Sequence, residues 1–152
     1  MEKLQAHQEG RLHRAVSVCL FNADGQWLLQ RRAMKKYHSP GLWSNSCCSH
    51  PRPDETVEAA AQRRVFEELG VACRLSFLSS FIYKADVGGG LIEHEFDHLF
   101  IGRIEGPCSP NADEVEAVEW WPTAKIEQAL HEQPWLFTKW FPIVFEQMLK
   151  RL

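Results

Sequence analysis

The sequence predicts an α+β fold in which a mixed β-sheet is flanked by helices. Three features predict it: strand-like runs lie on both sides of a central helical segment, pairs of these runs meet at glycine turns, and further helical patterns follow near the end of the chain. The chain has 152 residues, 45% of them hydrophobic, which suits one core. Residues 1–152 are therefore expected to form a single domain.

The first hairpin is predicted over residues 15–32. Two β-rich runs there flank Asp24 and Gly25, a pair that supplies the positive φ of a tight turn. Residues 33–42 carry charges and show no periodicity, so they predict a surface loop. The loop leads into a short extended segment at residues 43–50.

A helix is predicted from Asp54 to Leu69. Asp54 is a candidate N-cap, apolar residues recur at helical spacing from Val57 onward, and Gly70 stands where a glycine often ends a helix. Arg64 and Glu68 are four residues apart and so share one helix face. The plain interpretation of that pair is a solvated ion pair.

Beyond this helix the pattern returns to strands. Residues 73–85 and 91–104 form a second predicted hairpin around Gly88–Gly90, and Val115–Trp121 is a further strand. Two amphipathic helices are predicted at the end of the chain, Pro122–Glu132 and Thr138–Leu152, with Pro142 in the first turn of the second or kinking it.

Charge and composition narrow the class of ligand. Seventeen basic and twenty acidic side chains leave a net charge of -3, which does not predict the cationic surface that nucleic acid or anionic lipid attracts. The sequence shows neither a signal peptide nor a membrane span. The five cysteines include no CxxC pair, so reduced thiols are expected. We expect a cytoplasmic monomer or homodimer with a small-molecule substrate.

One strand predicts an acidic face. Glu93, Glu95 and Asp97 alternate and so point to the same side, which is unfavourable unless a cation or solvent compensates. A solvated sheet face is one interpretation. Metal binding is the other, because three histidines together with Glu93 and Glu95 make a mixed nitrogen and oxygen donor set suited to manganese, zinc, iron or magnesium. The histidines are His7, His13 and His50; His38 and His131 show no partners in the sequence.

The segment from Ser49 to Val71 resembles the Nudix box. The positions that match in register are Glu55, Arg63, Val65, Glu67, Glu68, Gly70 and Val71. Ser49 replaces a glycine, and Arg64 replaces a glutamate that helps Nudix hydrolases hold the magnesium ions used to cleave a diphosphate. The resemblance implies a Nudix-like mixed sheet and a site that grips a diphosphate without cutting it, with a Nudix pyrophosphohydrolase as the alternative.

The run from Trp43 to Pro51, with Cys48 and His50 inside it, resembles the signature of the type I isopentenyl-diphosphate isomerase family. Further matches follow along nearly the whole chain, including Glu93-His94-Glu95 and Trp135 through Trp140. This resemblance implies interconversion of isopentenyl and dimethylallyl diphosphate in isoprenoid biosynthesis. A metal-stabilised binding module is the non-enzymatic alternative.

The resemblance also implies residue roles. An alkene shift needs two acid/base groups across the substrate and an electron-rich wall beside the cation. The catalytic set is Cys48 and Glu95 as the pair, Tyr83 assisting and Trp140 as the wall. The diphosphate set is Arg31, Arg64, Lys3, Lys35, Lys36 and Ser49. A transition ion, Mn²⁺ or Zn²⁺, is assigned to His7, His13, His50, Glu93 and Glu95, and Mg²⁺ to Glu68 and the carbonyl of Cys48. His7 stands one residue closer to His13 than is usual in the family.

Overall fold

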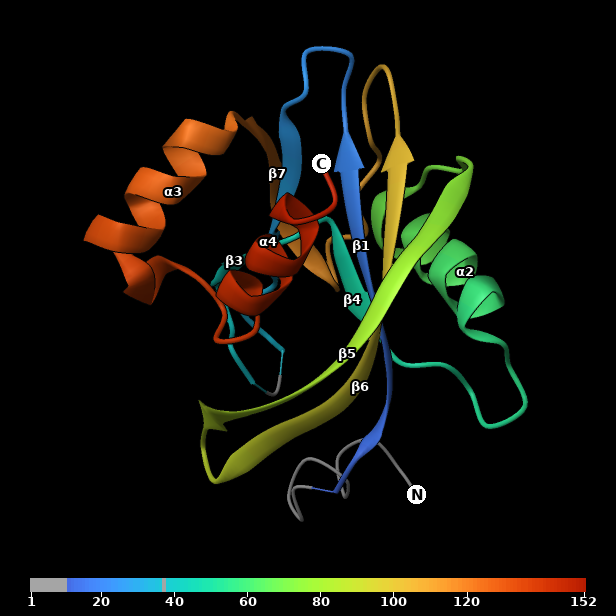
Figure 1. Cartoon of the computed structure of the whole chain (residues 1–152), viewed down its shortest axis with the longest axis vertical. Helices are drawn as coiled ribbons and strands as arrows, with labels where there is room; N and C mark the ends of the chain where they lie inside the picture. Colours follow the sequence, from blue (N-terminus) through green and yellow to red (C-terminus); the bar gives the residue numbers. More distant parts are fainter. Residues whose placement is uncertain (1–10, 37) are drawn as a thin grey trace.

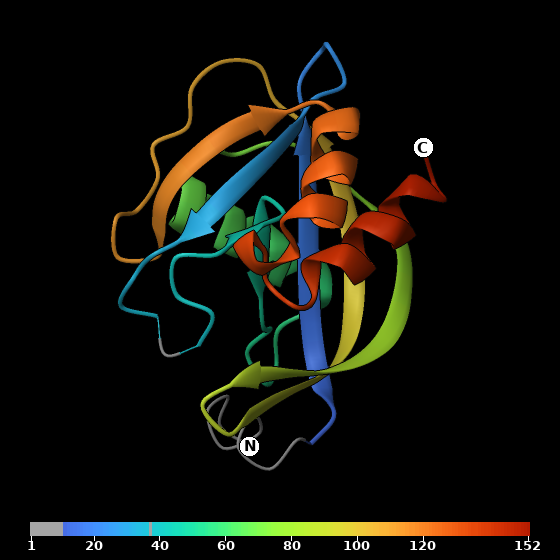
Figure 2. The ribbon, with the colours of Figure 1, turned by 90° about the vertical axis from the view of Figure 1, so that its left-hand side faces the viewer.

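The computed structural model describes residues 11–36 and 38–152. In this part of the chain a seven-stranded mixed sheet has the order β3-β2-β1-β6-β5, with β4 paired to β1 and β7 paired to β2. Figures 1 and 2 show α2 on one face of the sheet and α3 and α4 on the other. The elements are β1 (His13–Phe21), β2 (Trp27–Arg32), β3 (Trp43–Ser44), β4 (Cys47–Ser49), α2 (Val57–Leu69), β5 (Leu75–Gly88), β6 (Leu91–Arg103), β7 (Val115–Trp121), α3 (Thr123–Glu132), the 3-10 turn η1 (Pro134–Leu136) and α4 (Phe141–Leu149). The expected α+β class is confirmed.

Both predicted hairpins are present. β1 and β2 are antiparallel, and Gly25 has the positive φ of 74° that its turn requires. β5 and β6 pair along nearly their full length on either side of the turn at Gly89 and Gly90. The one parallel pair in the described sheet joins β1 to β6, with His13 beside Glu95. This register places the start of β1 next to the acidic strand.

The start of helix α2 corrects the prediction. Thr56, not Asp54, is the N-cap, and its hydroxyl accepts the backbone N–H of Ala59 at 3.1 Å. The residues just before the cap are held outside the helix because the guanidinium of Arg14 donates to the carbonyl oxygens of Arg52 and Glu55. The helix ends at Leu69 as predicted, with Gly70 in the left-handed region.

Two other segments differ from the prediction. The last helix, α4, is shorter than expected, and Pro142 lies in its first turn, where its missing N–H costs no hydrogen bond. The loop after β2 is not simply a surface loop: Ala33, His38 and Ser39 within it are buried. This loop therefore contributes side chains to the interior.

Alternation along β1 divides the core in two. Val16, Val18 and Leu20 pack in the cluster that includes α2 residues, whereas Cys19 and Phe21 face the cluster that includes α3 and α4 residues. The second cluster also holds Tyr83 and Trp140, and buried polar residues adjoin it. Tyr83 and Trp140 also line a polar pocket, which begins where this apolar cluster ends.

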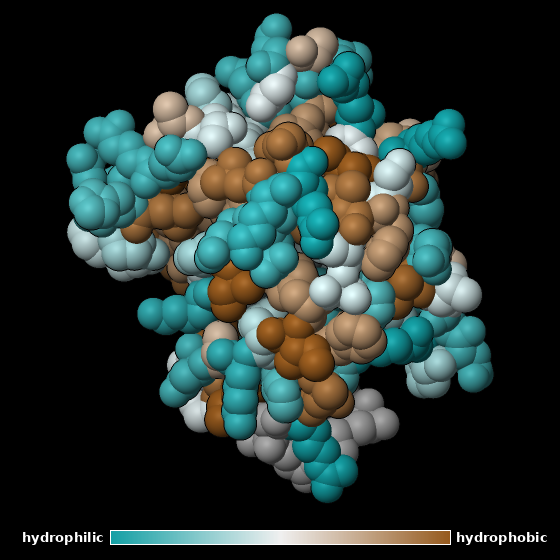
Figure 3. All heavy atoms as spheres, viewed as in Figure 1, coloured by the Kyte–Doolittle hydropathy of each residue, from teal (hydrophilic) through white to brown (hydrophobic). Residues whose placement is uncertain are grey.

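The surface is mixed in character. Figure 3 shows apolar patches among polar side chains on one face of the molecule. Strand β5 contributes Phe77 and Ile82, which are 50% and 61% exposed. No helix in the described part of the chain is long and apolar enough to cross a membrane.

Candidate active site and metal centre

A polar pocket gathers side chains from β1, β2, β4, α2, β5, β6, the loop after β2 and the segment before α4. Its lining includes Ser17, Arg32, Lys36, His38, Cys48, Ser49, His50, Arg64, Glu68, Tyr83, Glu93, Glu95, Asp97 and Trp140. Residues far apart in the sequence thus meet in one place, and all four residues expected to be catalytic are among them.

Four predicted metal ligands converge beside this pocket. The candidate ligand atoms of His13, His50, Glu93 and Glu95 all lie within 4.8 Å of one another. The Nε2 atoms of both histidines lie 2.8 Å from the carboxylate of Glu95, each at a different oxygen. Glu93 and Glu95 are 3% and 1% exposed, so their charges need compensation. Two imidazoles and two carboxylates at this spacing fit a transition ion. His7 lies outside the described residues.

Local structure explains the convergence. Glu93 and Glu95 are two apart on β6 and share a face, and the parallel register puts His13 beside Glu95. His50 follows β4, which pairs with β1 on the side away from β6. The solvated-face interpretation of the acidic strand is therefore wrong: Glu93, Glu95 and Asp97 are all buried.

The sulfur of Cys48 is held by Trp140 and Asn45. Trp140 Nε1 donates to Cys48 Sγ at 3.1 Å, and the thiol donates to Asn45 Oδ1 at 3.0 Å. A flip of the Asn45 amide would break two hydrogen bonds, because its NH₂ group donates to the carbonyl oxygens of Val18 and Cys47. Burial raises the pKa of Cys48 to about 12, so the group is a thiol at neutral pH.

Its neighbour Cys47 has a different environment. Strand alternation turns the Cys47 side chain into the cluster that packs on α2, where it is fully buried. Cys48 instead packs against the cluster on the α4 side and lines the pocket. Of these two adjacent cysteines, Cys48 alone can meet a substrate there.

Asp97 is a buried carboxyl that sequence reasoning placed on the acidic face without a role. Ser17 Oγ donates to Asp97 Oδ2 at 2.6 Å, and Ser17 Oγ also lies 3.8 Å from Cys48 Sγ. Burial raises the pKa of Asp97 to about 8. On the neighbouring strand Tyr83 is paired opposite Glu95, and burial together with these carboxylates raises the pKa of its hydroxyl.

The Asp97 pKa predicts a pH effect on stability. The carboxyl of an unfolded chain has a pKa of about 3.9. Between pH 4 and 8 the folded state therefore binds more protons at Asp97, and this group's contribution to the unfolding free energy falls as pH rises. Relative to the native protein, Asp97→Asn should gain stability across this range by up to about 1.4 kcal/mol per pH unit. Urea unfolding of chelator-treated protein measures the difference; a difference independent of pH would contradict the assignment.

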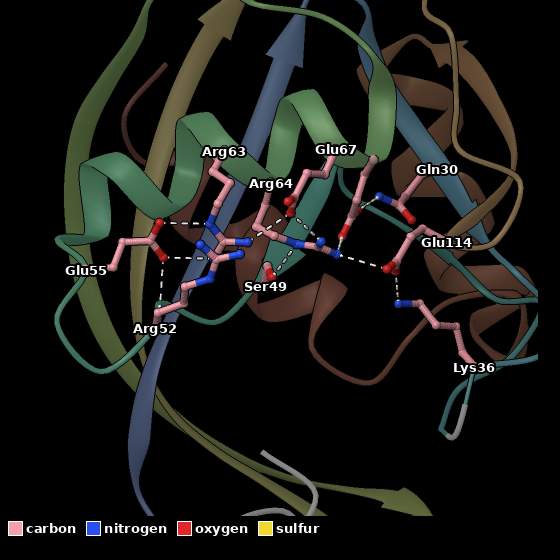
Figure 4. A network of polar contacts seen from close by, with 10 residues as sticks. Gln30, Lys36, Ser49, Arg52, Glu55, Arg63, Arg64, Glu67 and Glu114 are labelled. Atoms are coloured by element: carbon pink, nitrogen blue, oxygen red, sulfur yellow. Dashed lines mark hydrogen bonds and ion pairs between the residues drawn. The ribbon is translucent and has the colours of Figure 1, made fainter. Parts of the chain in front are cut away.

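The cationic end of the pocket centres on Arg64. Figure 4 shows its guanidinium between Ser49, Glu67 and Glu114. Arg64 donates to Ser49 Oγ at 2.8 Å and to the carboxylates of Glu67 and Glu68 at 2.7 Å. The alternative interpretation, a solvated pair with Glu68, is wrong, because the Glu68 side chain is only 4% exposed. Lys36 pairs with Glu114, so this side chain also reaches the network.

Neighbouring basic residues differ in position. Arg31 is exposed and donates to the carbonyl of Gly41, and Lys35 pairs with Asp113; neither lines the pocket. Arg32 is 8% exposed and does line it, with its guanidinium 5.2 Å from the centre of the Trp140 ring. The family resemblance assigned Arg31, not Arg32, to the diphosphate, and the register of β2 shifts between these two residues. Lys3 lies outside the described residues.

The fold and this site define a NUDIX-domain protein. The model of the NUDIX domain matches residues 11–141. Solved structures agree: a MutT protein from Methanosarcina mazei superposes with a TM-score of 0.74 at 18% identity, covering 92% of this chain and 94% of that one. A MutT NUDIX hydrolase from Burkholderia pseudomallei gives 0.70 at 25% identity, with 90% and 98% covered.

Curated relatives narrow the class. The chain is 46% identical over 147 residues to isopentenyl-diphosphate Delta-isomerase 1 of Aromatoleum aromaticum, covering 97% of this chain and 83% of the relative. It is 49% identical over 146 residues to isopentenyl-diphosphate Delta-isomerase of Jannaschia sp., covering 94% and 82%. The chain therefore belongs to the isopentenyl-diphosphate Delta-isomerase family of NUDIX-domain proteins.

Proposed function

We propose that this protein is an isomerase that interconverts isopentenyl diphosphate and dimethylallyl diphosphate for isoprenoid biosynthesis. The observation that carries the proposal is the joint presence of Cys48 and Glu95 in one pocket, with metal donors beside Glu95 and basic side chains at another part of the lining. We further propose that the protein works in the cytoplasm as a monomer or homodimer.

The reaction moves one double bond by one position. A proton adds to the terminal alkene carbon of isopentenyl diphosphate, which leaves a tertiary carbocation-like centre. A proton is then lost from the carbon directly next to this centre, on the side of the diphosphate. Cys48 and Glu95 are the two groups that give and take these protons, and they exchange roles in the reverse direction. Tyr83 lies opposite Glu95 and assists proton transfer by hydrogen bonding. Tyr83 and Glu95 are buried and Cys48 is partly buried, which limits the access of water to the cation.

The diphosphate is bound at the basic end of the pocket. Arg64 and Lys36 supply positive charge there, Arg32 adds a further cation to the pocket lining, and Ser49 lies against Arg64. Glu68 suits Mg²⁺, because each of its oxygens accepts one N–H, from Gln30 and Arg64, and keeps a second lone pair. Mg²⁺ bound to Glu68 and the carbonyl of Cys48 would neutralise diphosphate charge.

The His and Glu donors hold a second divalent ion, Mn²⁺ or Zn²⁺. The described donors are His13, His50, Glu93 and Glu95, whose arrangement fits such an ion, and His7 stays a predicted fifth ligand. The ion would supply the positive charge that the two buried carboxylates need. An ion held by these side chains would also fix the position of Glu95, the acid/base group.

Product analysis tests the proposal. Purified protein incubated with isopentenyl diphosphate, Mg²⁺ and Mn²⁺ or Zn²⁺ should form dimethylallyl diphosphate without releasing phosphate. Release of phosphate or of a monophosphate would instead identify a pyrophosphohydrolase. The position of Arg64 favours isomerisation over hydrolysis. Its guanidinium lies among Glu67, Glu68 and Glu114, and it replaces the glutamate that helps Nudix hydrolases hold magnesium ions.

Trp140 is predicted to stabilise the carbocation. Its ring lines the pocket and already lies near the Arg32 guanidinium. A desolvated cation-π contact contributes about 2 kcal/mol or more, or roughly 30-fold in rate. Turnover should therefore fall in the order Trp, Phe, Leu at position 140, measured as kcat in steady-state assays. If Trp140→Leu folds and turns over at the native rate, the group that stabilises the carbocation is a residue other than Trp140.

A further inference from the structure

The loop between β2 and β3 delivers an unassigned histidine to the pocket. His38 is 5% exposed although its loop has the composition of a surface segment. The sequence showed no partner for it, and the structure corrects that expectation: His38 Nε2 lies 3.1 Å from Glu93 Oε1. His38 is not one of the four described metal donors, but it contacts one of them, Glu93.

The imidazole of His38 contacts two parts of the site at once. On one side Nε2 meets the carboxylate of Glu93, and on another the ring meets Trp140 edge-on, with centroids 5.6 Å apart at 84°. Its Nδ1 lies 3.3 Å from the hydroxyl of Ser39. A carboxylate can only accept, so the Nε2 atom facing Glu93 is the one suited to carry hydrogen, and Nδ1 then accepts from Ser39.

The loop is built to hold this side chain inward. Ser39 has φ of 51°, and it is the one residue other than glycine with positive φ in the described chain. Such a conformation is costly for serine and persists only where surrounding contacts enforce it. Arg32 supplies such contacts: its guanidinium donates to the carbonyl of His38, and its backbone pairs with Gly41 and Leu42.

We propose that His38 is a positioning residue that sets the carboxylate of Glu93 for metal binding and braces Trp140. This inference rests on the metal centre of the proposed function. Carboxylates that bind metals are themselves usually held by outer partners, and removing such a partner typically costs 10–100-fold in metal affinity or activity. A histidine that merely filled the core would instead leave metal affinity unchanged.

Two substitutions separate the contacts of His38. His38→Phe keeps an aromatic ring of similar width against Trp140 but has no donor for Glu93. His38→Gln keeps an N–H donor near the position of Nε2. His131→Phe, at an exposed site on α3, is the matched control.

The readout is the dissociation constant for Zn²⁺ and for Mn²⁺ at one fixed pH, measured by competition with a chelator. We expect His38→Phe to weaken binding by about 10–100-fold, and His38→Gln and His131→Phe to bind within about 3-fold of the native protein. Native affinity in a folded His38→Phe would overturn the proposal, as would equal losses in His38→Phe and His38→Gln. Thermal melting establishes folding; if His38→Phe does not fold, His38→Met replaces it with the same expected loss.

The same titration separates this proposal from the metal centre itself. His50→Ala is included because it removes a direct donor. If the native protein binds neither ion, the metal centre fails and the role of His38 fails with it. If the native protein binds an ion, His50→Ala loses it and His38→Phe does not, the metal centre stands and His38 is only part of the core.

Discussion

Cys48→Ala and Glu95→Gln should each reduce kcat by at least ~10² while leaving the fold intact. Each substitution removes one of the two groups that transfer protons. The thiol of Cys48 is held by Trp140 and Asn45 at one position in the pocket, so alanine leaves no group there that can replace it. Steady-state assays in both directions measure the effect, and circular dichroism establishes the fold.

Cys47→Ala is the matched control for the thiol. Cys47 is the adjacent residue, but its side chain packs in the core on the α2 side. The substitution should leave kcat near the native value, with a modest loss of stability from the smaller side chain. Native turnover in Cys48→Ala, or a comparable loss in Cys47→Ala, would show that the thiol of Cys48 is not the acid/base group.

Loss of the transition ion should abolish most activity. We expect one Mn²⁺ or Zn²⁺ per chain to survive gel filtration and to be lost in His13→Ala and in His50→Ala. Each histidine contacts a different oxygen of Glu95, so either substitution also leaves a buried carboxylate with less compensation. Metal ions contribute several kcal/mol to catalysis where they act, so turnover should fall by ~10² or more.

Elemental analysis and assays after chelation measure this effect. Activity should return when Mn²⁺ or Zn²⁺ is added back to the native protein but not to His13→Ala. Mg²⁺ alone should not restore it, because Mg²⁺ favours oxygen ligands and this site offers two imidazoles. His131→Ala, on the surface of α3, controls for loss of an unrelated histidine. Fully active protein without bound metal would rule out the centre.

Much of the fold could be predicted because its signals are local. The turn at Gly25, the left-handed Gly70 and the alternation of Glu93 and Glu95 depend on a few neighbouring residues, and all three were confirmed. The start of α2 was not predicted correctly, because Arg14 in strand β1 holds the residues before Thr56 outside the helix. A contact across about 40 residues leaves no mark in the local pattern.

The site followed the same division. Spacing and residue type predicted Cys48, His50, Glu93 and Glu95 as site residues, and the family resemblance predicted Trp140 and Arg64. The structure brings them together in and around one pocket. What spacing did not show was the environment of Arg64: it has four partners and not Glu68 alone, because Ser49 and Glu114 approach from other elements.

By itself the sequence determined which chemistry this protein carries, because a thiol, carboxylates, imidazoles and guanidiniums are properties of residues and of their spacing. Only the tertiary structure decided which of several residues with the same chemical group lies at the site. Arg32 lines the pocket while Arg31 lies on the surface, and the register of β2 shifts between them. His38 lies behind Glu93 because the loop carrying it folds inward through contacts with Arg32. Side-chain direction in bulges and loops depends on packing between distant segments, and that packing exists only in the folded chain.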